Sequence, residues 1–310
     1  MLLKSSEKNN GGKKYKNGFG SIDGDFVKLC DSQFDATLER AAESVLKNGN
    51  VKIIGLTGPT CSGKTTAAKK LISMLNGVGA QVHVVSLDDF YKNQPYRERL
   101  DMRDATGIDF DSPDTLDIDE LEKFMSDVFA GNTAKLPKFD FRYGIRSGYT
   151  EVNAGESDVF IFEGIQVLYP KVVGLLDLYG GRIMYICAES GIETCGKKFE
   201  PDEVRLLRRI VRDRLFRATG AEFTFSLWES VRKNEDENIF PYADKADVFV
   251  DTTMAYELNV LKPYLEKAIS EIETGSKYFD DGMKIIEKIS DINPVDRNVI
   301  GKDSLYNEFV

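Results

Sequence analysis

The chain has 310 residues, of which 42% are hydrophobic and 30% are charged. This length allows one large domain or two of average size, and the composition is typical of a chain that folds around a core rather than of a disordered one. With 41 Lys and Arg against 51 Asp and Glu, the formal net charge is −10. That charge disfavours polyphosphate backbones and anionic surfaces, so we expect neither nucleic acid nor a membrane as a partner.

The cysteine spacing and the hydropathy of the chain indicate in which cellular compartment the protein functions. Cys30, Cys61, Cys187 and Cys195 have neither a CxxC nor a zinc-binding spacing, and His83 is the single histidine. We therefore expect reduced thiols and a histidine without a catalytic role. No secretion signal is visible, and no apolar run approaches the roughly 18 residues that cross a bilayer. These features predict a cytoplasmic protein.

The pattern along the chain predicts an α/β fold. Residues 1–24 are rich in Lys, Asn, Gly and Ser, which predicts a flexible tail before a single domain over 25–310. After the tail, β-branched runs alternate with stretches of helical periodicity, a pattern typical of a parallel sheet flanked by helices. We expect strands at 51–57, 81–87, 159–164, 182–188 and 247–252, and helices at 32–48, 64–76, 117–130, 202–218, 223–236, 254–273 and 281–289.

A phosphate-binding loop is the strongest motif. The segment IIGLTGPTCSGKTTAAKKL places Gly58, Gly63, Lys64 and Thr65 in the pattern G-x-x-x-x-G-K-T between an apolar strand and a helix. In such loops the backbone N–H groups and the helix N-terminus bind phosphates, the lysine reaches the β and γ oxygens, and the threonine hydroxyl can ligate Mg²⁺. Cys61 inside the loop is interpreted as a small residue rather than a reactive thiol.

Carboxylates follow two of the predicted strands. Asp88 and Asp89 end the run HVVSLDDFY, and Glu163 ends VFIFEGI. At the carboxyl ends of strands in a doubly wound sheet, such groups can hold Mg²⁺ or an attacking hydroxyl, although an aspartate there can also be a helix N-cap. In the acidic run DFDSPDTLDIDELEKF most carboxylates are expected to cap a helix or face solvent, and Asp111 is the candidate for binding neighbouring hydroxyls of a substrate.

One predicted helix carries many arginines. In EVRLLRRIVRDRLFR an arc of about 100° holds four arginines while the apolar residues occupy another arc. Such a face fits a lid, expected at about 205–236, that closes on phosphates. The alternative is a solvated face paired with Glu203 and Asp213. The arginines of the arc are Arg205, Arg208, Arg209 and Arg212, and Arg217 follows them.

Taken together, the segments GPTCSGKTT, SLDDFY, FDSPDTLD, LPKFDFRYG, FIFEGI, RLLRRIVRD and NIFPYADKADVFV resemble the uridine kinase and phosphoribulokinase family of P-loop kinases, in content and in order. The similarity runs from about residue 26 to the C-terminus. It is nearest to a bacterial-type branch whose kinase half often follows a TGS-like domain, which we expect to be absent here. The resemblance implies a P-loop-type parallel sheet with an arginine-bearing helical lid, followed by C-terminal helices over 254–310.

The resemblance also implies roles for individual residues, with ATP and Mg²⁺ as cofactors. Asp88 corresponds to the general base, and Lys64 and Arg212 to the residues that stabilise charge during transfer. The ATP-binding residues are Gly58, Pro59, Thr60, Cys61, Ser62, Gly63, Lys64, Thr65, Thr66 and Arg217. The candidate Mg²⁺ ligands are Thr65, Glu163 and Asp88. The candidate substrate-binding residues are Asp111, Phe139, Arg142, Tyr143, Arg146 and Arg209.

One departure from the family concerns the base. Animal uridine-cytidine kinases carry Tyr-Asp-Phe-x-x-His where this chain has Phe-Asp-Phe-Arg-Tyr-Gly at 139–144, so the histidine that reads the pyrimidine edge is missing. Phe139 can still stack a base, and Arg142, Tyr143 or Arg146 can donate hydrogen bonds to it. The lid differs too, because Ala-Thr-Gly follows Arg217 where those kinases have a tighter Gly-Arg.

The resulting prediction is an ATP-dependent small-molecule kinase that transfers the γ-phosphoryl of ATP to the 5′-hydroxyl of uridine or a related nucleoside. Two alternatives stay open. One is a different acceptor, namely a sugar, a sugar phosphate or another nucleoside; the other is a nucleotide-binding regulatory protein. The absence of an NKxD guanine motif and the presence of Lys64 and Asp88 disfavour the regulatory protein. A homo-oligomer is compatible with this prediction.

Overall fold

The computed structural model describes residues 15–16, 22–46, 52–93, 112–141, 143–155 and 158–310. The chain forms two compact units. The unit that we call the sheet unit contains residues 32–187 and 225–250, and the helical unit contains residues up to 31 together with 188–224 and 251–310. Most of the predicted tail lies outside the described residues, and the single domain over 25–310 stays a prediction.

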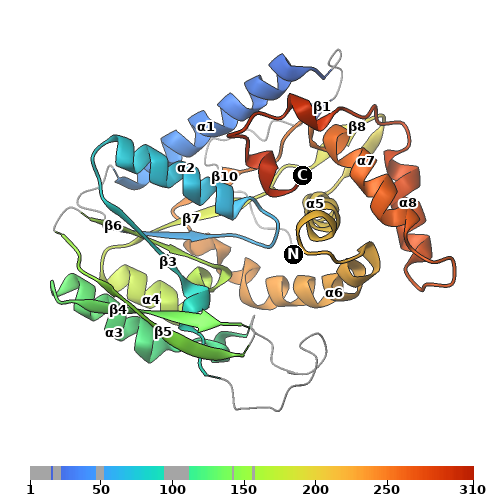
Figure 1. Ribbon diagram of the computed structural model, residues 1–310. Helices are drawn as coiled ribbons and strands as arrows, with labels where there is room; N and C mark the ends of the chain where they lie inside the picture. The colour runs from blue at the N-terminus through green and yellow to red at the C-terminus, as the bar shows by residue number, and fades with distance from the viewer. Residues whose placement is uncertain (1–14, 17–21, 47–51, 94–111, 142, 156–157) are drawn as a thin grey trace. The chain divides into compact units, whose positions relative to one another are not determined.

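The sheet unit is built on five strands in the order β10-β7-β2-β6-β3. The central strand β2 pairs in parallel with β6 and β7, and β3 pairs in parallel with β6. All of β2 is buried, because helices cover both faces of the sheet (Figure 1). The predicted α/β fold is therefore confirmed. The strands are β2 (Ile53–Thr57), β3 (Val82–Ser86), β6 (Val159–Glu163), β7 (Arg182–Cys187) and β10 (Val248–Asp251).

Helices enclose the sheet on its two faces. In Figure 1, α2 lies on one face, while α3 and α4 lie on the other. Beneath α3 and α4 is the main apolar cluster, where Phe124 of α3 packs edge-on against Phe160 and Phe162 of β6. The helices are α1 (Gly24–Leu46), α2 (Lys64–Gly77), α3 (Ile118–Phe129), α4 (Pro170–Leu178) and α6 (Ala221–Asn238). Short 3₁₀ helices are η1 (Leu87–Phe90), η2 (Pro113–Thr115), η3 (Ile165–Leu168) and η4 (Phe240–Lys245).

An antiparallel hairpin in the sheet unit was not expected from the sequence. Strands β4 (Ala134–Asp140) and β5 (Ile145–Val152) pair with each other and form a separate two-stranded sheet. The residues of β5 are exposed or half-buried along its whole length, so no alternation of apolar and polar residues marks it. Pro137 inside β4 also argued against a strand, although a proline is tolerated in an edge strand.

The helical unit combines a small sheet with three helices. Its strands β1 (Tyr15–Lys16), β8 (Ile192–Thr194) and β9 (Lys197–Phe199) pair in the order β1-β8-β9. Helix α5 (Pro201–Phe216) begins with a proline at its first position and a capping box between Glu200 and Glu203, which explains why it starts there. The remaining elements are α7 (Glu257–Ser270), α8 (Phe279–Ile289), η5 (Arg297–Val299) and η6 (Leu305–Glu308).

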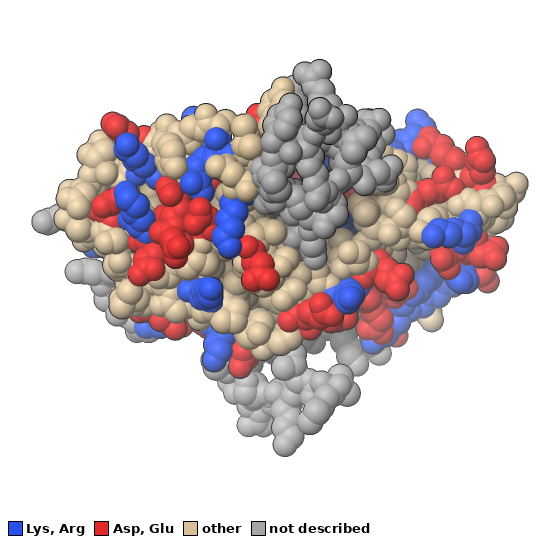
Figure 2. Space-filling view, turned by 90° about the horizontal axis from the view of Figure 1, so that it is seen from below, with Lys and Arg blue, Asp and Glu red and all other residues tan. Residues whose placement is uncertain are grey.

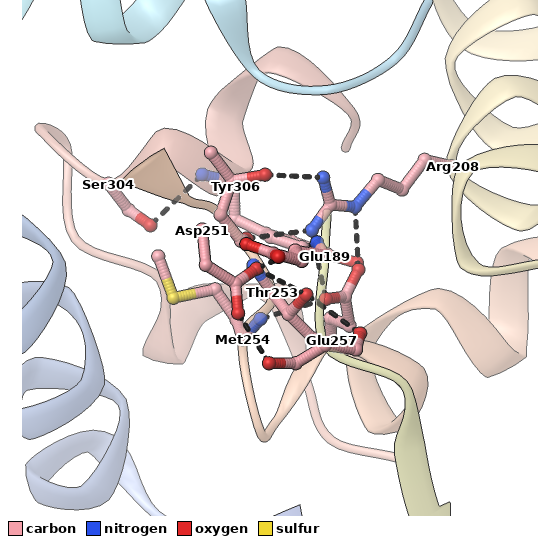
Figure 3. Close-up of polar contacts among 10 residues, drawn as sticks. Glu189, Arg208, Asp251, Thr253, Met254, Glu257, Ser304 and Tyr306 are labelled. Atoms are coloured by element: carbon pink, nitrogen blue, oxygen red, sulfur yellow. Dashed lines mark hydrogen bonds and ion pairs between the residues drawn. The ribbon is translucent and has the colours of Figure 1, made fainter. Parts of the chain in front are cut away.

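A buried ion pair joins α5 to α7 and corrects one expectation. Arg208, predicted to lie on an exposed arginine face, is fully buried and donates from Nε and Nη2 to the two carboxylate oxygens of Glu257 at 2.7 and 2.9 Å (Figure 3). It also donates to the Oγ1 and carbonyl oxygen of Thr252, and the Tyr306 hydroxyl donates to Glu257 at 3.0 Å. The helical periodicity of the sequence did not reveal that Arg208 is buried, because the carboxylate that compensates its charge, that of Glu257, is 49 residues away in the sequence.

The Arg208–Glu257 pair should be essential for the stability of the helical unit. We expect Glu257→Gln to lower the free energy of unfolding by about 3–5 kcal/mol, because it leaves the guanidinium of Arg208 buried without a counter-charge. Urea unfolding of the purified chain measures this. Glu271→Gln is the control, since Glu271 pairs with Arg214 at the surface and such pairs contribute about 0–1 kcal/mol. Equal losses in both variants would contradict the prediction.

Candidate active site

The phosphate loop connects β2 to α2 in a conformation that requires glycine. Gly58 has a φ of 151°, and a Cβ built on it would lie 1.8 Å from the carbonyl oxygen of Ile186 in β7. Gly63 has a φ of 90° and no side chain to cap α2. Cys61 is buried with a φ of 55°, so it serves as a small loop residue. The loop therefore lies against the sheet and leads into a helix whose N-cap residue has no capping side chain, as in a loop that binds phosphate.

The close approach at Gly58 gives a specific prediction. Gly58→Ala should weaken Mg-ATP binding at least tenfold, because the added methyl group displaces the loop from β7. Gly77→Ala in α2 is the matched control, since nothing lies within 4 Å of a Cβ built there. Isothermal titration of both variants with Mg-ATP measures the difference. Wild-type affinity in the Gly58 variant would show that the loop tolerates the shift.

Lys64 lies where the sequence motif predicts. Its Nζ donates to the carbonyl oxygens of Gly58 and Pro59, both at 2.8 Å, so the amine is held over the phosphate loop itself. Thr65, the next residue, is exposed at the first turn of α2. A charged amine, a hydroxyl and the N–H groups of the helix start are thus grouped in one short segment. This set of donors fits the phosphates of a nucleotide.

Asp88 is oriented by two residues that the sequence did not single out. Its Oδ1 accepts hydrogen bonds from Gln166 Nε2 at 2.7 Å and from the Tyr91 hydroxyl at 3.3 Å. Gln166 follows β6, is fully buried and also donates to the Tyr91 hydroxyl at 2.6 Å. The neighbouring Asp89 instead accepts the backbone N–H of Phe139 at 3.0 Å, which ties η1 to the hairpin. The two adjacent aspartates therefore have different roles.

Glu163 and Asp88 lie at the same edge of the sheet as the phosphate loop. In the sheet register, Glu163 is opposite both Leu56 of β2 and Ser86 of β3. The loop follows β2 and Asp88 follows β3, so all three lie at the carboxyl ends of adjacent parallel strands. Among the described residues no group of three or more Asp, Glu, His or Cys forms a metal site. One or two carboxylates and a hydroxyl fit Mg²⁺, which is usually held largely by waters and substrate phosphates.

The hairpin places the candidate acceptor-site residues in different surroundings. Phe139 is 9% exposed and packs edge-on against Tyr91, whereas Phe141 and Tyr143 are 46% and 60% exposed. Arg146 is ion-paired with Asp117 and Glu120, at 3.0 and 3.5 Å. The charge of the Arg146 guanidinium is therefore neutralised by two carboxylates, one from the N-cap residue of α3 and one from the first turn of that helix. Asp111 and Arg142 lie outside the described residues.

The candidate lid arginines of α5 converge on one carboxylate in the helical unit. Asp213, whose side chain is 4% exposed, accepts hydrogen bonds from Arg209 and Arg212 and forms an ion pair with Arg217 at 3.6 Å. Its carbonyl oxygen accepts the N–H groups of Arg217 and Thr219 at the end of the helix. Of the two carboxylates in the alternative, Asp213 pairs with these arginines, whereas Glu203 pairs with Lys288. The expectation of a solvated face is wrong, because Asp213 and Arg209 are buried.

The cysteines are reduced, as expected from their spacing in the sequence. All four cysteines are free, and burial together with the charge of Asp31 raises the pKa of Cys30 to about 11. His83 is half-buried, stacks on Phe160 and pairs with Asp158 at 2.7 Å. Among the described residues on the face in Figure 2, acidic and basic side chains are interleaved without a continuous basic surface. None of the described helices is long and apolar enough to cross a membrane.

A five-stranded sheet with a glycine-dependent phosphate loop and carboxylates beside it defines a P-loop protein of the kinase type. Residues 53–192 match the family described as "Phosphoribulokinase / Uridine kinase family". Over this region the chain resembles the phosphoribulokinase and uridine kinase family. This match supports a phosphotransferase, and kinases with such a loop generally use ATP with Mg²⁺.

Individual relatives agree with this assignment. The chain is 34% identical to uridine-cytidine kinase A of Dictyostelium discoideum over 206 residues, which are 65% of this chain and 37% of that protein. It is 27% identical to a uridine kinase of Limosilactobacillus reuteri over 208 residues, 67% of this chain and 86% of that protein. A solved structure of a possible uridine kinase from Bacillus stearothermophilus covers 71% of this chain and 100% of that chain, with 18% identity and a TM-score of 0.46.

Proposed function

We propose that this protein is a nucleoside kinase that transfers the γ-phosphoryl group of ATP to the 5′-hydroxyl of uridine or a closely related nucleoside. The observation that carries the proposal is Asp88, which follows β3 at the edge of the sheet where the phosphate loop follows β2. Its carboxylate is oriented by Gln166 and Tyr91. The relatives named as uridine kinases add support for the acceptor.

The phosphate loop, Lys64 and Asp88 have different roles in the proposed phosphoryl transfer. The N–H groups of the phosphate loop bind the ATP phosphates, and Lys64 moves from its loop carbonyls to the β and γ oxygens. Asp88 accepts the proton of the acceptor hydroxyl as that oxygen bonds to the γ-phosphorus, and the bond from this phosphorus to the β–γ bridging oxygen breaks to leave ADP. Mg²⁺ bound beside Thr65 and Glu163 would neutralise part of the negative charge of the phosphates.

The arginines of α5 are proposed to stabilise the charge that develops on the transferred group. Arg209, Arg212 and Arg217 are gathered around the carboxylate of Asp213, so one buried carboxylate holds three guanidinium groups together. A cluster of guanidinium groups is suited to bind a phosphoryl group. In this proposal Arg212 contacts the transferred group, Arg209 the substrate and Arg217 the ATP.

The acceptor is proposed to be recognised by the hairpin and by Asp111. The exposed aromatic rings of Phe141 and Tyr143 are suited to stack on a base, in addition to the more buried Phe139. A sugar phosphate is the second candidate acceptor, and it would require an extra basic site. Arg146 offers little for that purpose, because Asp117 and Glu120 already pair with it.

The decisive experiment is ADP release in a coupled assay with Mg-ATP and a panel of nucleosides, simple sugars and sugar phosphates, followed by mass analysis of the product. Turnover with uridine or cytidine that gives the 5′-monophosphate is the expected result. Turnover only with another hydroxyl compound would retain the kinase and reject the nucleoside. A chain that binds Mg-ATP but phosphorylates nothing would instead support a regulatory nucleotide-binding protein.

A further inference from the structure

A buried carboxylate from a distant helix contacts the phosphate loop. The Oε1 atom of Glu235, on the part of α6 that belongs to the sheet unit, accepts the backbone N–H of Thr60 at 3.2 Å. Glu235 is 1% exposed, and 175 residues separate it from Thr60. N–H groups of such a loop are the donors that bind phosphates. An acidic side chain on one of them is unexpected, because it brings a negative charge to a site for anions.

An arginine on the same helix balances this charge. Arg232 Nη1 donates to Glu235 Oε2 at 2.8 Å, so each oxygen of the carboxylate has a different partner. The guanidinium also lies over the ring of Phe240, 5.1 Å from its centroid, and 3.5 Å from Asp236. Arg232 is 27% exposed while Glu235 is almost entirely buried. Helix α6 therefore presents to the loop a buried carboxylate that carries a guanidinium partner, and Phe240 holds this guanidinium in place.

The consequence for phosphate binding follows from electrostatics. A buried carboxylate beside a phosphate site repels an incoming nucleotide strongly, because solvent screens it poorly. The ion pair with Arg232 offsets the negative charge of Glu235, so the hydrogen bond to Thr60 can order the loop with less repulsion of phosphates. The carboxylate then orders the loop, and the arginine makes that arrangement compatible with an anion.

We propose that Glu235 is a positioning residue that orders the phosphate loop through Thr60, and that Arg232 neutralises it so that nucleotide phosphates can bind. The proposal rests on the proposed function only in that the loop binds a nucleotide. It does not depend on which acceptor is phosphorylated. If the pair instead served only to stabilise α6, removing either partner would change stability but not the affinity for nucleotide.

The test is a double-mutant cycle on Mg-ATP binding by isothermal titration of the full chain. Arg232→Gln removes the guanidinium that pairs with Glu235 Oε2, so the Kd for Mg-ATP should rise about tenfold or more, a change of about 1.4 kcal/mol per decade. Glu235→Gln keeps an oxygen that can accept from Thr60 but removes the charge, so its Kd should stay within about threefold of wild type. The double variant should likewise return to within about threefold of wild type, because the repelling charge is gone.

Controls on the same helix separate charge from structure. Lys233→Gln makes the same change in net charge as Arg232→Gln, but Lys233 is exposed and pairs with Glu237 at 3.9 Å, so its Kd should not change. Arg232→Lys keeps the positive charge and should also bind normally, which keeps the test informative if Arg232→Gln does not fold. Thermal melts of each variant report the structural effect separately from affinity.

The outcomes distinguish this proposal from the proposed function. Wild-type binding of Mg-ATP, weak binding by Arg232→Gln and recovery in the double variant are the expected results. Normal affinity in Arg232→Gln, a tenfold loss in Glu235→Gln, or a double variant as weak as Arg232→Gln would overturn the proposal while leaving the kinase intact. Failure of the wild-type chain to bind Mg-ATP or Mg-ADP would overturn the proposed function, and this proposal with it.

Discussion

Asp88→Asn is expected to reduce turnover by about 10²–10⁴-fold, the range for losing a general base, while Mg-ATP affinity stays within a few fold. The substitution keeps an oxygen that can accept from Gln166 and Tyr91, so the hydrogen-bonded arrangement around position 88 is preserved. The substitution removes the negative charge of the carboxylate and with it the ability to take up a proton. Steady-state kinetics with the best acceptor, combined with titration of Mg-ATP, measure the two quantities on one preparation.

Asp89→Asn is the matched control for this prediction. Asp89 accepts the N–H of Phe139, and an asparagine oxygen can accept the same hydrogen bond, so turnover should remain within about fivefold of wild type. Both substitutions remove one negative charge from η1. Equal turnover in the two variants would show that position 88 does not supply the base, whereas a large loss at position 89 would reverse the assignment between the two aspartates.

Arg212→Met should have a comparable effect for a different reason. An arginine that stabilises the transferred phosphoryl group contributes about 10³–10⁵-fold to turnover, so we expect kcat to fall by at least about 10³-fold. The fold should survive, since Asp213 keeps Arg209 and Arg217 as partners. The affinity for the acceptor should change much less than kcat, because the interaction is strongest in the transition state.

Arg214→Met provides the comparison on the same helix. Arg214 forms an ion pair with Glu271, whose side chain is half exposed, and it is not part of the cluster around Asp213. We expect turnover to stay within about threefold of wild type, because surface ion pairs contribute little. Thermal melts of both variants exclude a general loss of structure. If Arg212→Met kept more than a tenth of wild-type kcat, the catalytic role of Arg212 would be wrong.

Much of the architecture was predictable because local patterns are strong in this chain. Apolar β-branched runs marked β2, β3, β6, β7 and β10, and the glycine and lysine spacing marked the loop before α2. Parallel strands buried on both faces are nearly continuous in hydrophobicity, so they are visible without a structure. The hairpin β4–β5 and helix α4 escaped notice, since exposed strands and short helices leave little periodicity.

The site was predictable only where a motif is contiguous. Lys64 and Thr65 belong to a short motif, and Asp88 and Glu163 directly follow strands, so their place at one edge could be inferred. Gln166, Tyr91 and Glu235 had no comparable signal. The role of a buried amide or carboxylate becomes visible only from its hydrogen-bond partner in the fold. Tyr91, a partner of Gln166, and Thr60, a partner of Glu235, lie 75 and 175 residues away from them in the sequence.

The amino-acid sequence by itself determined the fold class, the phosphate loop and the resemblance to the kinase family, because each depends on residues close together in the chain. The tertiary structure decided which charged side chains are paired within the protein. It buried Arg208 against Glu257, gathered three arginines on Asp213, neutralised Arg146 with α3 and its N-cap, and set a balanced Arg232–Glu235 pair against the loop. Charge pairing depends on distance in space and on exclusion of water, and neither is encoded in local spacing.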